Sequence, residues 1–412
     1  MKKGLSLIIA LIMLISVSAE ITANAVAETA NSYTRIFGEN RYETSIEISK
    51  IARNSADNVI IASGLNFPDA LSGGVLAHAL NAPILLTNGK TNLESAVLSR
   101  ISQIGTGNIY ILGGDASVSS AIESQLKNSY NVERICGNNR YETSVAIAQK
   151  IELITGSSPE AIFVTDSLEF ADALSITPVA ALLNAPIIFT PNNSTGLNAV
   201  SAGYVKTCGA KTAVIVGGTS AVKSDVESKL NEMGLATDRV FGNNRYETSA
   251  NIYHKYKVLF AGDAALIVTG RAFPDALSGG VLGGKVKAPL FLVNGTGTTS
   301  APIKSAIAEL KPGKIYVLGG NSVITDTVVN SHTGSESSST TATTTTTNTP
   351  TATAPIIGID DPNGDVWWSG TASGKAYHSH PDCANMNNPV RIKLSDALAK
   401  GLTPCKMKCC YG

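Results

Sequence analysis

An internal repeat constrains this chain of 412 residues more than any other feature. The pattern Arg-x-x-Gly-x-Asn-Arg-Tyr-Glu-Thr-Ser occurs at 35–45, 134–144 and 239–249, at intervals of 99 and 105 residues. Three further blocks follow in the same order in every copy: Phe-x-Asp-Ala-Leu-Ser, Ala-Pro with three apolar residues, and an apolar run that ends in Gly-Gly. This period is too long for a solenoid unit, so each copy is predicted to be a small domain.

Within a copy, short apolar runs alternate with helical patterns. In the first copy the runs at 59–62, 84–86 and 109–112 are typical of buried parallel strands, and helices are expected near 41–53, 68–80 and 93–103. This alternation predicts an α/β fold of three tandem Rossmann-like, parallel-sheet domains. Asn40 is placed to cap the first helix, and Glu43 three residues later is placed to reach back to the cap amide.

The ends of the chain differ from the repeats. Lys2 and Lys3, an apolar run and small residues near Ala27 are typical of a secretory signal peptide, and no second apolar run long enough for a bilayer follows. An exported protein is therefore expected. The predicted segments are a signal peptide at 1–27, repeats at 34–132, 133–237 and 238–332, a Thr/Ser-rich linker at 333–355 and a small module at 356–412.

The charge balance limits the possible partners. The 32 basic residues equal the 32 acidic residues, which excludes a globally basic nucleic-acid binder. The repeated arginines provide local positive charge for an anionic polymer, or they form structural ion pairs. The candidates are Arg35, Arg41, Arg134, Arg140, Arg239 and Arg245. Three similar binding units suit a ligand that itself repeats, because later contacts become intramolecular.

Catalysis is less favoured by this pattern. No Ser-His-Asp or Cys-His pairing recurs among the copies, although an enzyme needs one assembled catalytic set. The alternative is a wall-remodelling hydrolase that uses Asp69, Asp172 and Asp275, each of which also suits a structural role in a first helical turn. Cys136 replaces Phe37 and Phe241 of the other copies, which predicts a core position.

The four blocks resemble the cell wall binding repeat 2 family of Gram-positive surface proteins, over roughly residues 34–330. The resemblance implies a pseudo-threefold arrangement of the three domains and noncovalent anchoring to an anionic wall polymer at the cell surface. The family's Pro-Ile-Leu-Leu motif is linked to polymer binding and corresponds to Pro83, Ile84, Leu85, Leu86, Pro186, Ile187, Ile188, Phe189, Pro289, Leu290, Phe291 and Leu292. On the pattern alone these residues form a buried strand, so an indirect role is open. The second copy departs from the family, with Ala171 for proline and Ile176-Thr177 for the glycine pair.

The module at 356–412 is too small to bury much core, so a covalent or metal staple is expected. It resembles the Ada-like metal-binding domain of exported bacterial proteins, which implies zinc ligands at His378, Cys383, Cys405 and Cys409. The spacing Cys405-Lys-Met-Lys-Cys409 is one residue longer than usual, so Cys410 is an alternative fourth ligand. Two disulfides are the alternative to zinc, and the partner of this module stays unknown.

Overall fold

The computed structural model describes residues 33–192, 196–297 and 300–334 with their side chains. Beyond them it describes four short strands by their backbone: β13 (Asp365–Trp368), β14 (Ala376–Tyr377), β15 (Val390–Lys393) and β16 (Thr403–Pro404). The predicted signal peptide and most of the linker and small module lie outside the described residues.

The three repeats have the same order of strands and helices. The first contains β1 (Tyr33–Ile36), α2 (Arg41–Ala52), β2 (Asn58–Ser63), α3 (Pro68–Ala79), β3 (Ile84–Thr87), α4 (Ser95–Ile104), β4 (Asn108–Leu112) and α5 (Ser120–Lys127). The second contains β5 (Asn131–Ile135), α6 (Arg140–Thr155), β6 (Ala161–Asp166), α7 (Ala171–Leu182), β7 (Ile187–Thr190), α8 (Ala199–Thr207), β8 (Thr212–Val216) and α9 (Ser224–Glu232). The third contains β9 (Ala236–Val240), α10 (Arg245–Tyr256), η1 (Lys257–Leu259), β10 (Ala264–Thr269), η2 (Pro274–Ala276), α11 (Gly279–Val286), β11 (Leu290–Val293), α12 (Ala301–Leu310), β12 (Lys314–Leu318) and α13 (Asp326–Thr333).

The predicted α/β fold with parallel sheets is confirmed, and the three predicted strands of the first repeat appear as β2, β3 and β4. The large parallel sheets have the orders β3-β2-β4-β5, β7-β6-β8-β9 and β11-β10-β12-β1. In each sheet the last strand comes from the start of another repeat: β5 lies beside β4, and β9 lies beside β8. The predicted boundaries at 132/133 and 237/238 therefore fall inside strands that belong to the preceding sheet.

The ring closes through the first strand. β1 pairs in parallel with β12, from Tyr33 opposite Ile315 to Ile36 opposite Leu318, so it completes the third sheet. The side chain of Arg35 lies 2.6 Å from the carboxylate of Asp326 on α13 and strengthens this junction. The first and third repeats are joined here by noncovalent contacts, while the other two junctions also have a continuous chain.

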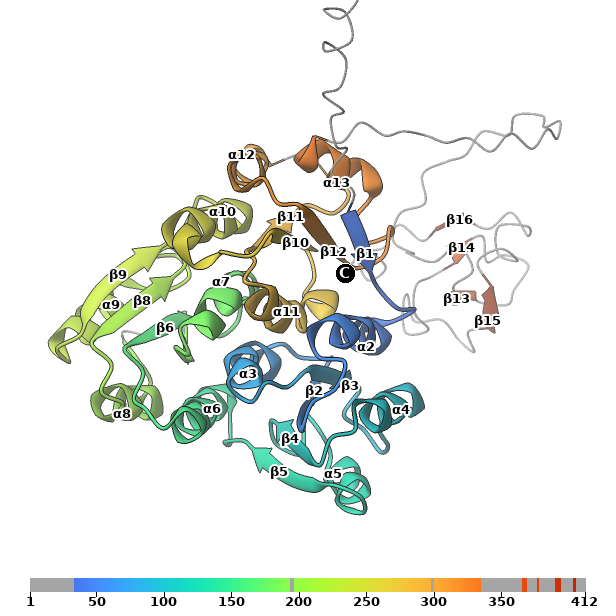
Figure 1. Ribbon diagram of the computed structural model, residues 1–412, viewed down its shortest axis with the longest axis horizontal. Coiled ribbons are helices and arrows are strands. Elements are labelled where there is room, and N and C mark those ends of the chain that lie inside the picture. Colours follow the sequence, from blue (N-terminus) through green and yellow to red (C-terminus); the bar gives the residue numbers. More distant parts are fainter. Residues whose placement is uncertain are drawn as a thin grey trace, which may run out of the picture.

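Three helices, α3, α7 and α11, lie at the centre of the ring, with the sheets and remaining helices around them (Figure 1). The residues that precede these helical turns meet on the pseudo-threefold axis. The ring centroids of Phe67, Phe170 and Phe273 are 5.4–6.2 Å apart, and each pair is edge-to-face. Edge-to-face geometry is a favourable arrangement for aromatic pairs. One phenylalanine from each repeat therefore holds the three domains together at one end of the axis.

The second repeat has Ile176-Thr177 in place of the glycine pair, and the packing on the same axis explains this difference. A Cβ added to Gly74 would lie 2.4 Å from the Cγ2 of Thr177, and one added to Gly280 would lie 2.3 Å from the same methyl. These three positions are equivalent in the three repeats, and the space between them holds one side chain. Thr177 therefore fills a gap that two glycines leave for it.

Candidate binding clefts between the repeats

A cleft of about 220 Å³ opens where the first repeat meets the second. It is lined by residues that follow three strands of one sheet: Asn66, Pro68 and Asp69 after β2, Gly114, Ala116 and Ser117 after β4, and Gly137, Asn138, Asn139, Arg140 and Thr143 after β5. The order β3-β2-β4-β5 places the topological switch point between β2 and β4. Open α/β sheets bind ligands at this point, outside the carboxyl ends of the strands.

An equivalent cleft of about 600 Å³ opens where the third repeat meets the first. Its lining comes from the corresponding segments: Phe37, Gly38, Glu39, Asn40 and Arg41 after β1, Thr269 at the end of β10 with Ala272, Pro274 and Asp275 after it, and Gly320, Asn321, Ser322 and Val323 after β12. The repeated blocks thus meet at the interfaces, where the arginine block of one repeat faces the aspartate block and Gly-Gly turn of another.

The second arginine of each block is held at its interface by a backbone carbonyl. Arg41 donates to the carbonyl oxygen of Gly64 at 2.7 Å. The same bond joins Arg140 to Ser167 at 2.6 Å and Arg245 to Gly270 at 2.7 Å. A hydrogen bond to a carbonyl leaves the guanidinium its charge and its other donors. Arg41 and Arg140 are therefore fixed in place and still able to bind an anion, whereas Arg245 also pairs with Glu169 at 3.3 Å.

The first arginine of each block has a structural place. Each donates to the carbonyl of the glycine that directly follows a strand and pairs with an acidic residue on the next helix. The pairs are Arg35 with Gly319 and Asp326, Arg134 with Gly113 and Glu123, and Arg239 with Gly217 and Glu227. These side chains are mostly buried and do not line the two clefts. Their charge is already matched by a carboxylate, so their contribution is to the junction between repeats.

The comparison with known proteins agrees with this geometry. The model of the family described as cell wall binding domain 2 matches residues 35–123, 134–227 and 239–329, which together cover more than half of the chain. The chain belongs to this family. The three matches coincide with the three repeats, so the predicted tandem array of cell wall binding domains is confirmed.

Relatives and solved structures support the same assignment. The N-acetylmuramoyl-L-alanine amidase LytC of Bacillus subtilis is 32% identical over 301 residues, which is 73% of this chain and 58% of LytC. Cwp8 from Clostridium difficile has a TM-score of 0.65 at 28% identity, over 74% of this chain and 52% of Cwp8. Cwp6 from the same organism has a TM-score of 0.66 at 26% identity, over 74% and 47% of the two chains. This chain therefore spans about half the length of these proteins, and the shared part is the binding-domain array.

The start of each cell wall binding domain is fixed by a helix cap. The Asn40 side chain accepts from the backbone N–H groups of Tyr42 and Glu43 at 3.0 Å, as predicted. The Glu43 carboxylate accepts from the backbone N–H of Glu39, one residue earlier than the predicted cap amide. A Cβ on Gly38 would lie 2.3 Å from the Cβ of Glu43, so this close approach requires the repeated glycine.

The repeated aspartates lie one to each interface. Burial raises the pKa of Asp69 and Asp275, and it raises the pKa of Asp172 to about 6. Ser117 donates to the Asp69 carboxylate at 3.0 Å, which joins the aspartate block to the Gly-Gly turn. Glycoside hydrolysis by paired carboxylates needs two of them roughly 5–10 Å apart across one bond. Because Asp69, Asp172 and Asp275 lie at three different interfaces, these three residues do not form such a pair with one another.

The Pro-Ile-Leu-Leu residues lie inside the cell wall binding domains. Ile84, Leu85 and Leu86 are at most 1% exposed, and the corresponding residues of the other copies are at most 2% exposed. These strands are β3, β7 and β11, at the edges of their sheets, and helices cover them. The folded chain gives a polymer no access to these side chains, so any part that they play in binding is indirect.

The core prediction for Cys136 is wrong. Cys136 is exposed, and Phe37 and Phe241 at the equivalent positions are 51% and 52% exposed. The three residues follow the last strand of a sheet, where the chain leaves the core and turns into the next helix. Phe37 lines the cleft between the third and first repeats, and the sequence pattern had no signal that separates this exposed aromatic from a core residue.

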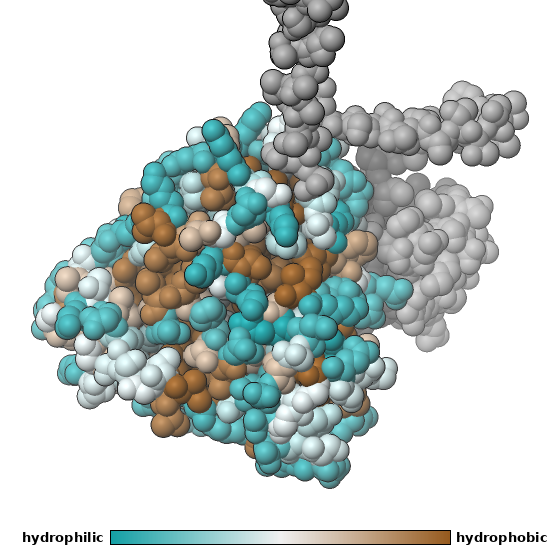
Figure 2. Space-filling model, viewed as in Figure 1, coloured by the Kyte–Doolittle hydropathy of each residue, from teal (hydrophilic) through white to brown (hydrophobic). Residues whose placement is uncertain are grey.

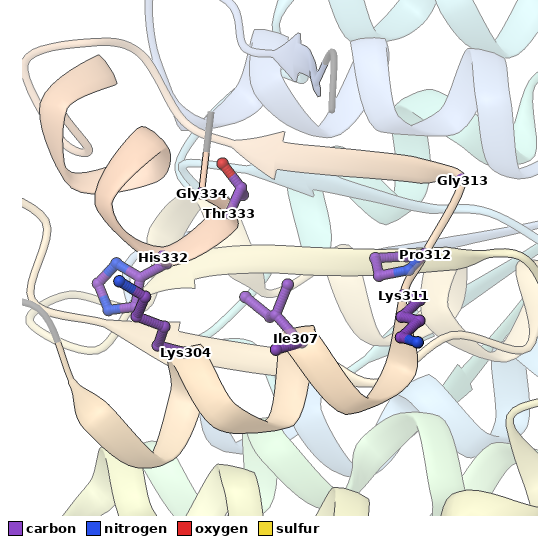
Figure 3. Close-up of a pocket in the computed structure, with 9 residues that line it drawn as sticks. Lys304, Ile307, Lys311, Pro312, Gly313, His332, Thr333 and Gly334 are labelled. Carbon is purple, nitrogen blue, oxygen red and sulfur yellow. The ribbon is translucent and has the colours of Figure 1, made fainter. Parts of the chain in front are cut away.

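A further pocket of about 440 Å³ lies between α12 and α13 (Figure 3). Lys304 and His332 lie at one end, Lys311 and Pro312 at the other, and Ile307 between them. His332 is a neutral structural residue here, because Nδ1 donates to the Val328 carbonyl, Nε2 accepts from the Ser300 N–H, and burial lowers its pKa.

Pseudo-symmetry explains this pocket. In the first repeat the chain between α5 and β5 occupies the equivalent position, where the backbone N–H of Tyr130 donates to the Leu126 carbonyl and that of Asn131 donates to the Gly107 carbonyl. α13 and β1 are not consecutive in the chain, so no equivalent connection crosses the third repeat within the residues that the structure describes. The pocket is therefore a feature of the junction and is separate from the two clefts.

Two predicted features receive no structural test. The proposed zinc ligands His378, Cys383, Cys405 and Cys409 lie outside the described residues, and so does the signal peptide. In the part of the chain that the structure describes, no group of three or more His, Cys, Asp or Glu side chains is arranged to hold a metal ion. No helix within those same residues is long and apolar enough to cross a bilayer.

Proposed function

We propose that this chain is an exported surface protein that the three domains hold noncovalently on the Gram-positive cell wall by binding an anionic wall polymer. The observation that carries the proposal is the repeated interface cleft at the carboxyl ends of parallel strands, each with a positioned arginine from the next repeat. Family membership supports association with the cell wall. The anionic character of the polymer is inferred from Arg41 and Arg140.

The clefts suit a sugar-containing anion in several ways. Guanidinium groups bind phosphate or carboxylate groups through two parallel hydrogen bonds, in bidentate geometry. Asn66, Asn138 and Ser117 add neutral hydrogen-bonding groups to the first cleft, and the exposed ring of Phe37 adds an apolar face to the other. Clefts repeated on one rigid ring let one long polymer, or neighbouring polymers, bind several sites at once, which raises overall affinity without a strong single site.

The test is the retention of the mature full-length chain on purified Gram-positive walls, before and after chemical removal of the anionic polymer. Retention that falls after removal and weakens with salt supports the proposal. Arg140→Gln is expected to reduce retention, while Lys211→Gln, an exposed change at the opposite ends of the strands, is the matched control. Equal retention on stripped walls would overturn the anionic-polymer version of the proposal.

A zinc-binding role for the module at 356–412 is proposed with it, from His378, Cys383, Cys405 and Cys409. β14 and β16 pair in parallel with Tyr377 opposite Pro404, which are the residues directly before His378 and Cys405. This pairing supports a shared site for two of the four ligands. Metal content and free thiols of the purified chain test the proposal: bound zinc supports it, and four unreactive cysteines without zinc would replace it with two disulfides.

A further inference from the structure

The interface between the second and third repeats has the same parts as the two clefts but a different charge. Asp172 follows β6, Gly217 and Gly218 follow β8, and Arg245 follows β9. These are the equivalents of Asp69, the Gly113–Gly114 turn and Arg140 at the first interface. We call this place the middle interface.

Glu169 makes the first difference. It occupies the position of Asn66 in the first repeat and Ala272 in the third. Its carboxylate lies 3.3 Å from the guanidinium of Arg245, and the same guanidinium lies over the ring of Phe170 at 5.3 Å from the centroid. In the part of the chain that the structure describes, neither Arg41 nor Arg140 forms an ion pair within 4.0 Å.

Asp166 makes the second difference. It occupies the position of Ser63 in the first repeat and Thr269 in the third, and it is 1% exposed at the end of β6. The middle interface therefore gathers three interacting carboxylates, two of which, Glu169 and Asp172, interact with its one arginine. The first cleft has Asp69 with Arg140, and the third-to-first cleft has Asp275 and the exposed Glu39 with Arg41.

The carboxylates of the middle interface interact electrostatically, which changes the pKa of Asp172. Burial is the main reason that the pKa of Asp172 is raised, and the charges of Asp166 and Glu169 raise it further against the opposing effect of Arg245. The negative charges of these carboxylates also repel an anion that enters the interface. An anionic group entering there must also displace Glu169 from Arg245.

We infer that the anionic polymer binds at the clefts of Arg140 and Arg41 and is excluded from the middle interface, so that the ring of three domains offers two binding sites. The inference rests on the proposed function and gives it a stoichiometry. Glu169 is the residue that closes the third position: it neutralises the arginine that the other two clefts leave available. The symmetry of the fold and the number of working sites are thus separate properties of this chain.

The experiment compares Arg41→Gln, Arg140→Gln and Arg245→Gln in the mature full-length chain, with walls that carry the polymer and with inorganic polyphosphate as a soluble probe. Each change removes one equivalent bond to a backbone carbonyl. Arg245→Gln also removes the ion pair with Glu169 and the contact with the Phe170 ring, and the thermal midpoint of each variant measures this difference in stability. Arg41→Gln and Arg140→Gln are each expected to weaken binding about tenfold or more through lost avidity. Arg245→Gln is expected to change it less than about twofold.

Glu169→Asn supplies the converse test, because it installs the first repeat's residue at the middle interface. We expect stronger retention and a third polyphosphate site in a titration. A loss with Arg245→Gln equal to the other two, or no gain with Glu169→Asn, would overturn the inference and leave the proposed function intact. Failure of the unaltered chain to bind polymer-bearing walls would instead overturn the proposed function.

Discussion

The hydroxyl of Ser45 accepts a hydrogen bond from the backbone N–H of Leu86 at 3.0 Å and joins the first repeated block to the third. The same bond joins Ser249 to Leu292 at 3.1 Å and Ser144 to Phe189 at 3.5 Å. Because β3 is an edge strand, this buried N–H has no neighbouring strand to bind. The contact explains why the two blocks recur together, and it connects the buried Pro-Ile-Leu-Leu strand to the helix that begins with Arg41.

Ser45→Ala is expected to lower the free energy of unfolding by about 1–3 kcal/mol, because it leaves a buried N–H without an acceptor. Chemical denaturation followed by circular dichroism measures this change. Ser102→Ala is the control, since that hydroxyl is exposed on α4 and its loss is expected to cost less than about 0.5 kcal/mol. Equal costs for the two variants would show that the Ser45–Leu86 bond contributes little.

Gly74→Ala is expected to destabilise the ring by about 1–3 kcal/mol, because its methyl would lie 2.4 Å from that of Thr177. Gly203→Ala on α8 is the matched control, since nothing lies within 4 Å of its added Cβ, and it is expected to stabilise by about 0.5–1 kcal/mol. Thermal unfolding checks both. Adding Thr177→Gly to Gly74→Ala is expected to restore part of the loss, and no recovery would argue against the shared gap on the axis.

Asp172→Asn is expected to stabilise the fold at neutral pH. The folded-state pKa of about 6 lies above the ordinary value of 3.8, so the folded chain holds the proton more tightly than the unfolded chain. The stability from this group is fully present below pH 3.8 and is lost as the pH rises through 6. That loss is about 3 kcal/mol. Denaturation at pH 4 and pH 7.5 should show the variant's advantage at the higher pH only; an advantage equal at both would contradict the assignment.

Arg35→Gln is expected to loosen the third sheet selectively. It removes the ion pair with Asp326 and the bond to the Gly319 carbonyl at a junction that has no continuous chain. Charge-assisted bonds of this kind contribute about 1.5–3 kcal/mol. Hydrogen exchange is expected to accelerate in β1 and β12, while Arg134→Gln, which loses the equivalent bonds inside a continuous junction, should affect its sheet less. Equal acceleration in the two variants would show that a continuous chain does not stabilise a junction between repeats.

The sequence predicts the secondary structure well where the signal is local. The apolar runs of β2, β3 and β4 and the cap at Asn40 are each read from a few consecutive residues, and the structure confirms them. The strand at 131–135 was missed, because its residues are half exposed and short of apolar character. Its pairing with β4 also depends on a partner in the preceding repeat.

The clefts are harder to predict for a related reason. Each combines three segments, such as Asn66–Asp69, Gly114–Ser117 and Gly137–Arg140, that are distant along the chain and meet only when one repeat packs on another. Family resemblance directs attention to Pro83–Leu86, which the fold buries. Repetition identifies the residues that matter, but it does not distinguish those that hold an interface together from those that line it.

The sharing of strands between repeats also limits how such a protein can change. A linear array gains binding strength when another unit is added to its end. Here each sheet takes its last strand from a different repeat, and Phe67, Phe170 and Phe273 meet on one axis, so a fourth copy has no place and a lost copy leaves a sheet incomplete. The number of domains is fixed by geometry. The affinity for a surface can then change only at individual clefts, through single residues such as Glu169.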